Sequence, residues 1–261
     1  MNVKRALVTG AAKRLGREMA LYLGAQGFDV AVHYNGSKAE ADEVVARLKD
    51  MGRMAAACPA NLLDEDETAA LGPQAAKALG GPISVLVNNA SIFEPDEIET
   101  ATRKSWDRAI GSNLRAPFVL TQFLASQAPA PSTDANGEPR AEALIVNMID
   151  QRVRKLTPDF VSYTIAKMGL WAFTQTSAQA LAGRVRVNAI GPGPTMQGIR
   201  QSDAHFQNQR AASITGRGAN PEDITHALGY FLGAHAVTGQ LICVDGGQHL
   251  GWQTPDVLGP E

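Results

Sequence analysis

Tyr163 and Lys167 are the residues of this sequence best suited to chemistry. They lie four positions apart inside a stretch with helical apolar spacing, so we expect both side chains on one helix face. A free phenol has a pKa of about 10 and is a weak acid at neutral pH. A nearby ammonium favours phenolate, so Lys167 is expected to lower the pKa of Tyr163 and make it a general acid. Such a pair alone is common on solvated helices, so the catalytic interpretation depends on the other motifs in the sequence.

The elements around this pair alternate between short apolar runs and longer helix-like stretches. Expected strands are 6–8, 30–32, 54–58, 85–87, 144–146, 185–190 and 241–244. Most lack polar alternation, which indicates strands covered by helices on both faces of a parallel sheet. The pattern predicts an α/β fold: a single doubly wound, Rossmann-type domain over residues 1–261, with a mostly parallel seven-stranded sheet. Ligands of such sheets bind beyond the carboxyl ends of the strands.

Composition excludes several classes of function. The chain has 261 residues, a net charge of -2 and no basic run, which gives no support to a nucleic-acid partner. Cys58 and Cys243 are too few and too far apart for a disulfide framework or a metal site, so no metal is expected. No apolar run approaches the roughly 20 residues of a membrane span, and no signal peptide is visible, so a cytoplasmic protein without a membrane partner is expected. Residues 128–141, rich in proline, are expected to form an exposed loop inserted between a helix and a strand.

A glycine-bearing turn follows the first expected strand and opens the first helix. Its sequence, from Thr9 to Gly16, is typical of a site where backbone N–H groups and a helix N-terminus meet a pyrophosphate. The side chains of Lys13 and Arg14 place two positive charges in this turn, which suits a cofactor with extra negative charge. The expected cofactor contacts here are Gly10, Lys13, Arg14, Leu15 and Gly16.

The end of the second expected strand indicates which dinucleotide binds. NAD sites usually carry an acidic residue there for the ribose 2′-hydroxyl, but this chain has no carboxylate until Glu40. Hydrogen-bond donors that could hold a 2′-phosphate stand there instead, so the expected cofactor is NADP(H). The residues are His33, Tyr34, Asn35 and Ser37. A surface histidine without a cofactor contact is an equal alternative for His33.

Five motifs occur in the order seen in short-chain dehydrogenases/reductases, and the resemblance covers essentially the whole chain. They are the turn from Thr9 to Gly16, Asn88-Asn89-Ala90, Asn113, Tyr163 with Lys167, and Gly191-Pro192-Gly193.

This resemblance implies roles for further residues. Asn113 would support a water chain behind Lys167, which would also hold the nicotinamide ribose. Other cofactor contacts implied are Asn61, Leu62, Asn89, Ala90, Ser91, Pro192, Gly193 and Thr195. Members of the family are usually tetramers or dimers, so a homotetramer is expected, with the helix of Trp171 and Phe173 packing on a neighbour.

One residue departs from the family pattern. Thirteen positions before Tyr163, where the family typically has a serine that bonds the substrate carbonyl, this chain has Asp150. Asp150 could simply cap a loop. Alternatively, a carboxyl group in a partly dry pocket could hold or relay a proton to a ring nitrogen.

The aspartate is also found in pteridine reductases, which resemble this chain at Arg14, in the His-Tyr…Ser stretch after the second strand, and in Asn-Ala-Ser followed by phenylalanine. The resemblance implies that a pterin lies between the nicotinamide and Phe93, with Arg14 and Ser91 nearby. Stacking and a guanidinium donor suit a flat heteroaromatic ring.

We therefore expect hydride transfer from NADPH to a C=N bond of a pterin, from dihydropterin to tetrahydropterin. Tyr163 would be the general acid or its relay, Asp150 its partner, and Lys167 and Asn113 its support. Residues 196–217, polar through Gln197, His205 and others, would form a lid over the substrate, with His205 solvated. Two alternatives stay open: a carbonyl reductase for a 3-oxoacyl or sugar-like ketone, and a catalytically silent nucleotide-binding protein. Which pterin is reduced, and whether oxidised pterins or folates are too, is also open.

Overall fold

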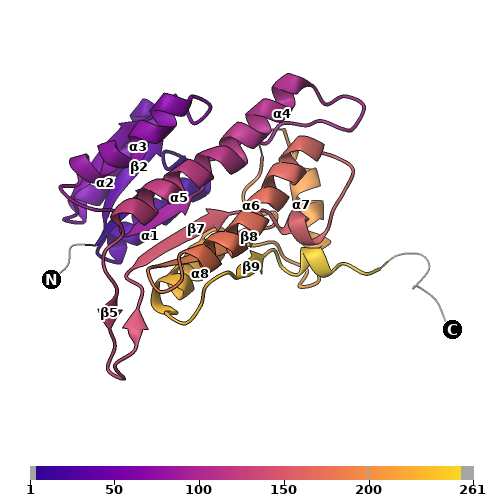
Figure 1. Cartoon of the computed structure of the whole chain (residues 1–261). Coiled ribbons are helices and arrows are strands. Elements are labelled where there is room, and N and C mark those ends of the chain that lie inside the picture. Colours follow the sequence, from indigo (N-terminus) through magenta and orange to yellow (C-terminus); the bar gives the residue numbers. More distant parts are fainter. Residues whose placement is uncertain (1–3, 199, 254–261) are drawn as a thin grey trace.

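The first half of the chain builds strands and helices in strict alternation. The computed structural model describes residues 4–198 and 200–253, so the ends of the expected domain and position 199 of the expected lid lie outside the described residues. The elements are β1 (Arg5–Val8), α1 (Arg14–Ala25), β2 (Asp29–Tyr34), α2 (Lys38–Asp50), β3 (Ala55–Pro59), α3 (Glu65–Ala78) and β4 (Val85–Asn88). Figure 1 shows this half as one end of the molecule.

The second half continues the alternation with longer helices. It contains α4 (Arg103–Ile110), a π-helical turn (Gly111–Arg115), α5 (Ala116–Gln127), β5 (Ser132–Thr133), β6 (Pro139–Arg140), β7 (Ala143–Met148), a 3-10 turn (Gln151–Arg154), α6 (Val161–Ala180), β8 (Val185–Pro192), α7 (Asp203–Ala211), α8 (Pro221–Gly233), β9 (Leu241–Val244) and a last 3-10 turn (Gln248–Leu250).

The central sheet confirms the predicted fold class. Its seven strands run in the order β3-β2-β1-β4-β7-β8-β9, and every neighbouring pair is parallel. The strand order reverses between β1 and β4, where Val8 pairs with Val32 on one side and Val87 on the other. The crevice beyond these carboxyl ends is where doubly wound sheets bind their ligands.

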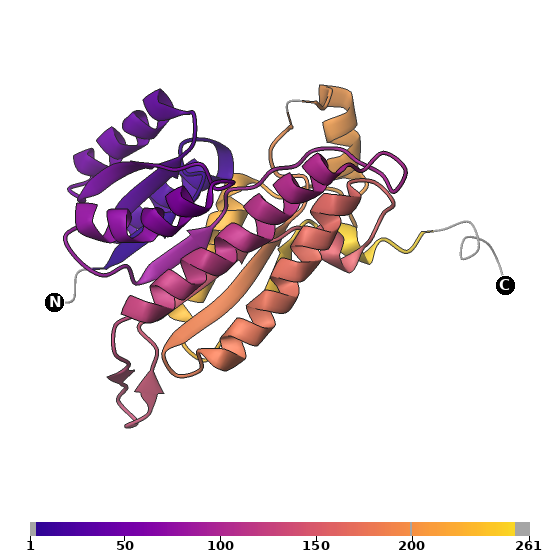
Figure 2. The same ribbon diagram turned by 45° about the horizontal axis from the view of Figure 1, so that its top comes forward.

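Helices bury both faces of the sheet. Because the strands are apolar at nearly every position, they present apolar side chains to both faces, and both must be covered. Along β1, Val8 faces the cluster of α1, α2 and α8, whereas Leu7 faces the opposite cluster of α3, α5 and α6. Figure 2 shows α5 and α6 side by side across one face of the sheet. Each fully buried leucine or valine stabilises the fold by about 1.5–3 kcal/mol, so the core holds the strand ends in fixed relative positions.

Residues 128–141 differ from the expected loop. Their tip is a two-stranded antiparallel hairpin of β5 and β6, and it projects from the body of the domain in Figure 1. Asp134 accepts hydrogen bonds from the N–H groups of Asn136 and Glu138 at 2.8 and 2.9 Å, and Gly137 takes a positive φ of 82°. The segment is an insertion between a helix and a strand, as predicted, but local hydrogen bonds order it.

Three further observations concern the predictions about membrane spans, metal sites and cysteines. None of the described helices is both long and apolar enough to cross a membrane. Over residues 4–198 and 200–253, no cluster of acidic, histidine or cysteine side chains could hold a metal ion. Cys58 is buried as expected, whereas Cys243 is partly exposed.

Candidate active site

The turn between β1 and α1 can approach a phosphate closely. Gly10 has a positive φ of 61°, and a Cβ atom there would lie 3.0 Å from Cα of Ala90. A Cβ atom on Gly16 would overlap the carbonyl oxygen of Gly10, so both positions need glycine. Lys13, the N-cap residue of α1, makes no side-chain cap, which leaves the N–H groups of this helix end to an anion. The turn fits the pyrophosphate of a dinucleotide.

Hydrogen bonds fasten this turn to the end of β4. The hydroxyl oxygen of Thr9 accepts from the backbone N–H groups of Asn89 and Ala90, each at 2.9 Å. The amide of Asn89 donates to the carbonyls of Thr9 and Gly10 at 2.8 and 3.2 Å. Asn89 therefore braces the turn, and Thr9 is a positioning residue that the sequence analysis did not single out, although it heads the motif.

His33 is not a phosphate ligand, which corrects the prediction, and it is not a surface residue either. It is 2% exposed, its Nδ1 accepts from the N–H of Gly10 at 2.8 Å, and its Nε2–H donates to the carbonyl of Ala60 at 3.0 Å. Both ring nitrogens are thus committed to backbone groups. The side chain turns inward beneath the glycine turn and supports it.

The buried histidine should make the protein acid-sensitive. Burial lowers the pKa of His33 from 6.5 to about 4. Between these values the unfolded chain binds the additional proton, so stability rises with pH through this window and is lost as the pH falls. We expect His33 to contribute up to about 3 kcal/mol to this acid-induced loss. Denaturant unfolding of the wild type and of the non-titrating His33→Asn variant at pH 4 to 7 measures it. The difference between the two should change across the window; parallel curves would contradict the assignment.

The adenosine end of the site offers cationic and neutral donors. Lys13 lies 2.6 Å from the carboxylate of Glu40, and both side chains are exposed. The hydrogen bond from Lys13 lowers the pKa of Glu40. Ser37 begins α2 without a side-chain cap, and Asn35 is exposed beside it. Tyr34 is 8% exposed, so of the four predicted contacts at this strand end only His33 is less accessible.

Lys13 should set the preference for the phosphorylated cofactor. Lys13→Ala is expected to raise KM for NADPH about tenfold, the effect of one charge-assisted hydrogen bond, with a much smaller change for NADH. Steady-state kinetics with both cofactors measures this. Lys49→Ala, at the far end of α2, is the matched control. A wild-type preference for NADH would contradict the assignment of NADPH itself.

Two other predicted cofactor contacts lie at the end of β3. The N–H of Asn61 donates to Glu67 at 2.6 Å, and its side-chain oxygen accepts from the N–H of Leu63 at 3.2 Å. Asn61 and Leu62 are partly exposed. They lie at the carboxyl edge of the sheet, as predicted, and their cofactor contacts stay predictions.

Asp150 and Tyr163 meet directly. Tyr163 lies in the first turn of α6, and its hydroxyl donates to Oδ2 of Asp150 at 2.9 Å. Oδ1 of Asp150 accepts from the N–H of Arg152 at 2.8 Å and caps the 3-10 turn that follows β7. Asp150 therefore caps a turn and also accepts a hydrogen bond from the phenol, and its part in proton transfer stays a prediction.

Lys167 lies one turn further along α6. Its Nζ is 5.6 Å from the ring centroid of Tyr163 and donates to the carbonyl of Met148 at 2.7 Å. The side chain is 2% exposed, and burial lowers the pKa of Lys167 from 10.5 to about 8. The predicted pairing on one helix face is confirmed, and the carbonyl at the end of β7 fixes the position of the ammonium.

The electrostatics of Tyr163 differ from the expected activation. Burial, and then the carboxylate of Asp150, raise the pKa of Tyr163 well above 10. Burial also raises the pKa of Asp150 above its ordinary value. The expected lowering of this pKa is thus wrong for this arrangement, because burial and the carboxylate of Asp150 outweigh the groups that lower it, which are Arg152 and Ser91. The phenol is therefore a weaker acid here than in water, whereas the raised pKa of Asp150 favours a carboxyl group that can supply a proton through the phenol.

Asn113 positions the loop that follows β4. It is fully buried in the π-helical turn, and its side-chain oxygen accepts from the hydroxyl of Ser91 at 2.7 Å and from the N–H of Ile92 at 3.2 Å. Its amide donates to the carbonyl of Ile92 at 2.9 Å. Asn113 therefore fixes Ser91 close to Tyr163, and its support of a water chain stays a prediction.

Phe93 lies against a second phenylalanine that the sequence analysis missed. The rings of Phe93 and Phe160 are stacked, with centroids 4.1 Å apart and planes 9° apart. Phe93 also contacts Tyr163 edge-on at 4.7 Å, and it is 42% exposed. Phe160 has a left-handed φ of 59°, an unusual conformation for an aromatic residue and one that occurs at functional sites. An exposed ring beside the phenol fits the predicted ring-stacking role of Phe93.

The expected lid lies over the glycine turn. Arg14, itself at a positive φ of 53°, donates to the carbonyls of Met196 and Gln197 at 2.9 and 2.8 Å. Arg14 thus joins the turn to the lid, and its contacts with the cofactor and a pterin stay predictions. The lid carries α7, on which His205 is exposed, as expected.

The strand end before the lid also requires a glycine. A Cβ atom on Gly193 would lie 2.5 Å from Cβ of Asp245, so this turn packs tightly against the segment that follows β9. The hydroxyl of Thr195 donates to the carbonyl of Gly193 at 3.0 Å. Pro192, Gly193 and Thr195 lie at the carboxyl end of β8, where a nicotinamide pocket was predicted.

Comparisons with known proteins agree with this geometry. The family model described as Enoyl-(Acyl carrier protein) reductase matches residues 10–249. The chain is 31% identical over 254 residues to the 3-oxoacyl-[acyl-carrier-protein] reductase FabG of Staphylococcus aureus, covering 95% of this chain and 98% of that protein. The crystal structure of FolM Alternative dihydrofolate reductase 1 from Brucella suis in complex with NADP superposes with a TM-score of 0.90 at 39% identity, covering 98% of each chain.

A second solved structure, the angucycline C-6 ketoreductase LanV with bound NADP, superposes with a TM-score of 0.85 at 29% identity, covering 95% of this chain and 96% of that one. Both of these solved structures contain NADP, and the glycine turn of this chain fits that cofactor. The chain belongs to the short-chain dehydrogenase/reductase family and is an NADP-dependent oxidoreductase.

Proposed function

We propose that this reductase transfers a hydride from NADPH to the C=N bond of a dihydropterin and yields a tetrahydropterin. The hydrogen bond between Tyr163 and Asp150, at 2.9 Å in a desolvated site, is the observation that carries this proposal. Reduction of a C=N bond delivers a hydride to carbon and a proton to nitrogen. A phenol hydrogen-bonded to a carboxyl group whose pKa is raised by burial can supply that proton.

Each residue of the centre has a part in the proton transfer. Bound NADPH supplies the hydride from its nicotinamide and leaves as NADP⁺. Tyr163 donates the proton to the ring nitrogen or relays it from Asp150, whose pKa is raised by burial. Lys167, held by the carbonyl of Met148, holds the nicotinamide ribose and places a positive charge near the phenol. Phe93, 42% exposed beside the phenol, contacts the flat pterin ring.

The similarity to a protein named as a dihydrofolate reductase supports a pterin substrate, since folates contain a pterin ring. A ketone substrate is the second candidate, because relatives such as FabG are named as 3-oxoacyl reductases. The ketone is the weaker candidate, because Asp150 stands where the family typically has the serine that bonds a substrate carbonyl. The catalytically silent alternative is disfavoured because Asp150, Tyr163 and Lys167 are assembled in contact.

A substrate panel tests the proposal. NADPH oxidation is measured with dihydrobiopterin, dihydrofolate, a 3-oxoacyl thioester and a sugar-like ketone. Turnover with at least one dihydropterin, and a kcat/KM for it well above that for either ketone, is the expected result. Turnover of the ketones alone would replace the proposal with carbonyl reduction.

A further inference from the structure

The first turn of α6 carries the reacting phenol, but its N-cap residue does not cap it. That residue, Phe160, has a left-handed φ of 59° and makes no side-chain hydrogen bond to the helix. Its carbonyl accepts from the N–H of Thr164 at 2.8 Å. The N–H groups ahead of Thr164 need acceptors from elsewhere, because the first N–H groups of a helix have no partner inside it.

Asp96, from the loop between β4 and α4, supplies two of these acceptors. Its backbone carbonyl accepts from the N–H of Val161 at 3.2 Å, and Oδ1 of its side chain accepts from the N–H of Ser162 at 3.1 Å. Asp96 is 6% exposed and Ser162 is 1% exposed. Breaking a buried bond of this kind leaves both groups unsatisfied, so the contact is held firmly. The cap of α6 thus comes from a segment 66 residues earlier in the chain.

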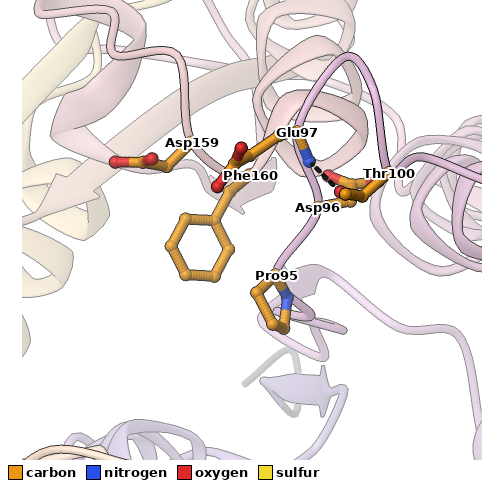
Figure 3. A pocket seen from close by; sticks show the side chains of 6 residues that line it. All are labelled: Pro95, Asp96, Glu97, Thr100, Asp159 and Phe160. Atoms are coloured by element: carbon orange, nitrogen blue, oxygen red, sulfur yellow. Dashed lines mark hydrogen bonds between the residues drawn. The ribbon is translucent and has the colours of Figure 1, made fainter.

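The loop that carries Asp96 is anchored on both sides of this residue. Before it, Glu94 accepts two hydrogen bonds from Arg108 of α4, at 2.8 and 3.0 Å. After it, the N–H of Glu97 donates to the hydroxyl of Thr100 at 2.9 Å, and Figure 3 shows this bond beside Asp96. The loop can therefore hold the start of α6 in a fixed position.

The two hydrogen bonds from α6 to Asp96 lie directly before the phenol in the sequence. Tyr163 follows Ser162, and its hydroxyl lies 2.9 Å from Oδ2 of Asp150. The loop of Asp96 also carries Phe93, whose ring contacts Tyr163 edge-on at 4.7 Å. One loop therefore fixes both the backbone of the proton donor and the aromatic ring beside it. Reaction rates fall steeply when a reacting group is displaced by about 1 Å.

We propose that Asp96 is a positioning residue of this reductase, which caps α6 and thereby holds the hydroxyl of Tyr163 where it can pass a proton to the substrate. This inference rests on the proposed role of Tyr163 in proton transfer. Oδ2 of Asp96 is buried without a hydrogen-bond partner among the described residues, so the bond through Oδ1 is the side-chain contact that matters. A neutral side chain of the same shape should therefore replace Asp96, and a longer acidic one should not.

Two variants separate the position of the acceptor oxygen from its charge. Asp96→Asn keeps an oxygen at the place of Oδ1, and asparagine caps helices about as well as aspartate, so kcat should stay within about twofold of the wild type. Asp96→Glu keeps the acidic group but moves its oxygens by one methylene, so kcat should fall about tenfold or more. KM for NADPH should stay unchanged in both, because Thr9 and Asn89 hold the glycine turn. The assay uses NADPH and the best substrate of the panel above.

Asp64→Glu is the matched control for the loss of a cap. Asp64 caps α3, where its Oδ1 accepts from the N–H of Glu67 at 2.9 Å. The variant makes the same chemical change on a helix that does not carry the phenol. It should lower the melting temperature as Asp96→Glu does and keep the kcat of the wild type. An equal fall in kcat would assign the effect to lost stability.

A double-mutant cycle tests whether Asp96 acts through the phenol. In the Tyr163→Phe background, Asp96→Glu should change the residual single-turnover rate by less than about twofold, because the hydroxyl that it positions is absent. A tenfold loss in that background, wild-type kcat in Asp96→Glu, or an equal loss in Asp96→Asn would overturn the inference. The proposed function fails separately: if the wild type reduced only ketones, the same cycle measured with a ketone would still decide the part of Asp96.

Discussion

Tyr163→Phe is expected to lower kcat by about 10² to 10⁴, the usual contribution of a positioned general acid. The substitution removes only the hydroxyl that donates to Asp150 at 2.9 Å and keeps the buried ring and its contact with Phe93. The fold and the glycine turn do not depend on this hydroxyl. We therefore expect the melting temperature and the Kd for NADPH to stay close to those of the wild type.

The matched control for this variant is Tyr230→Phe. Tyr230 lies on α8, is 54% exposed and has no place in the site, so its kcat should equal that of the wild type. Single-turnover measurements with preformed NADPH complex show whether the loss lies in the chemical step. If Tyr163→Phe retained wild-type turnover, Tyr163 would have no role in proton transfer.

Asp150→Ser should reverse the substrate preference and lower dihydropterin turnover by about 10² or more, since it removes the second proton-holding group. Serine is the residue that the family typically has at this position, and its hydroxyl can donate to a ketone oxygen. A gain of activity with a 3-oxoacyl thioester is therefore expected alongside the loss. The measurement is kcat/KM for one pterin and one ketone, in the wild type and in the variant.

Asp150→Asn separates this effect from simple loss of structure. Asparagine can still accept from the N–H of Arg152, which caps the 3-10 turn, but it cannot hold or deliver an acidic proton. Its dihydropterin turnover should fall as in Asp150→Ser, without a gain with the ketone. Full pterin turnover by either variant would show that the carboxyl group is dispensable and would favour carbonyl reduction.

The sheet and the identity of the central residues could be predicted from the sequence because each depends on local pattern. Strands buried on both faces read as uninterrupted apolar runs, and β1 and β4 end at the motifs that line the crevice. Tyr163 and Lys167 share a helix face by spacing alone. The short strands β5 and β6 were missed, since a two-residue strand has no periodicity to detect.

The remaining features depend on contacts that only the folded chain makes. The side chain of His33 points inward because it forms hydrogen bonds with Gly10 and Ala60, which lie far from it in sequence. The pKa of Tyr163 depends on how deeply the fold buries the phenol beside Asp150, and this burial reverses the effect expected from Lys167. Phe160 contacts Phe93 from the loop before α6, where it has a left-handed φ, and Arg200 contacts it from the lid. No sequence pattern predicts either contact.

The central claim is that hydride passes from the cofactor to the carbon of a pterin C=N bond while the centre of Asp150 and Tyr163 supplies the proton. Mass spectrometry and NMR of the product formed from 7,8-dihydrobiopterin and NADPH deuterated at nicotinamide C4 test it directly. The account predicts a tetrahydropterin with one deuterium on the carbon of the reduced bond and solvent hydrogen on the neighbouring nitrogen. An unlabelled pterin, recovered from enzyme that transfers the same deuterium to a ketone, would contradict it.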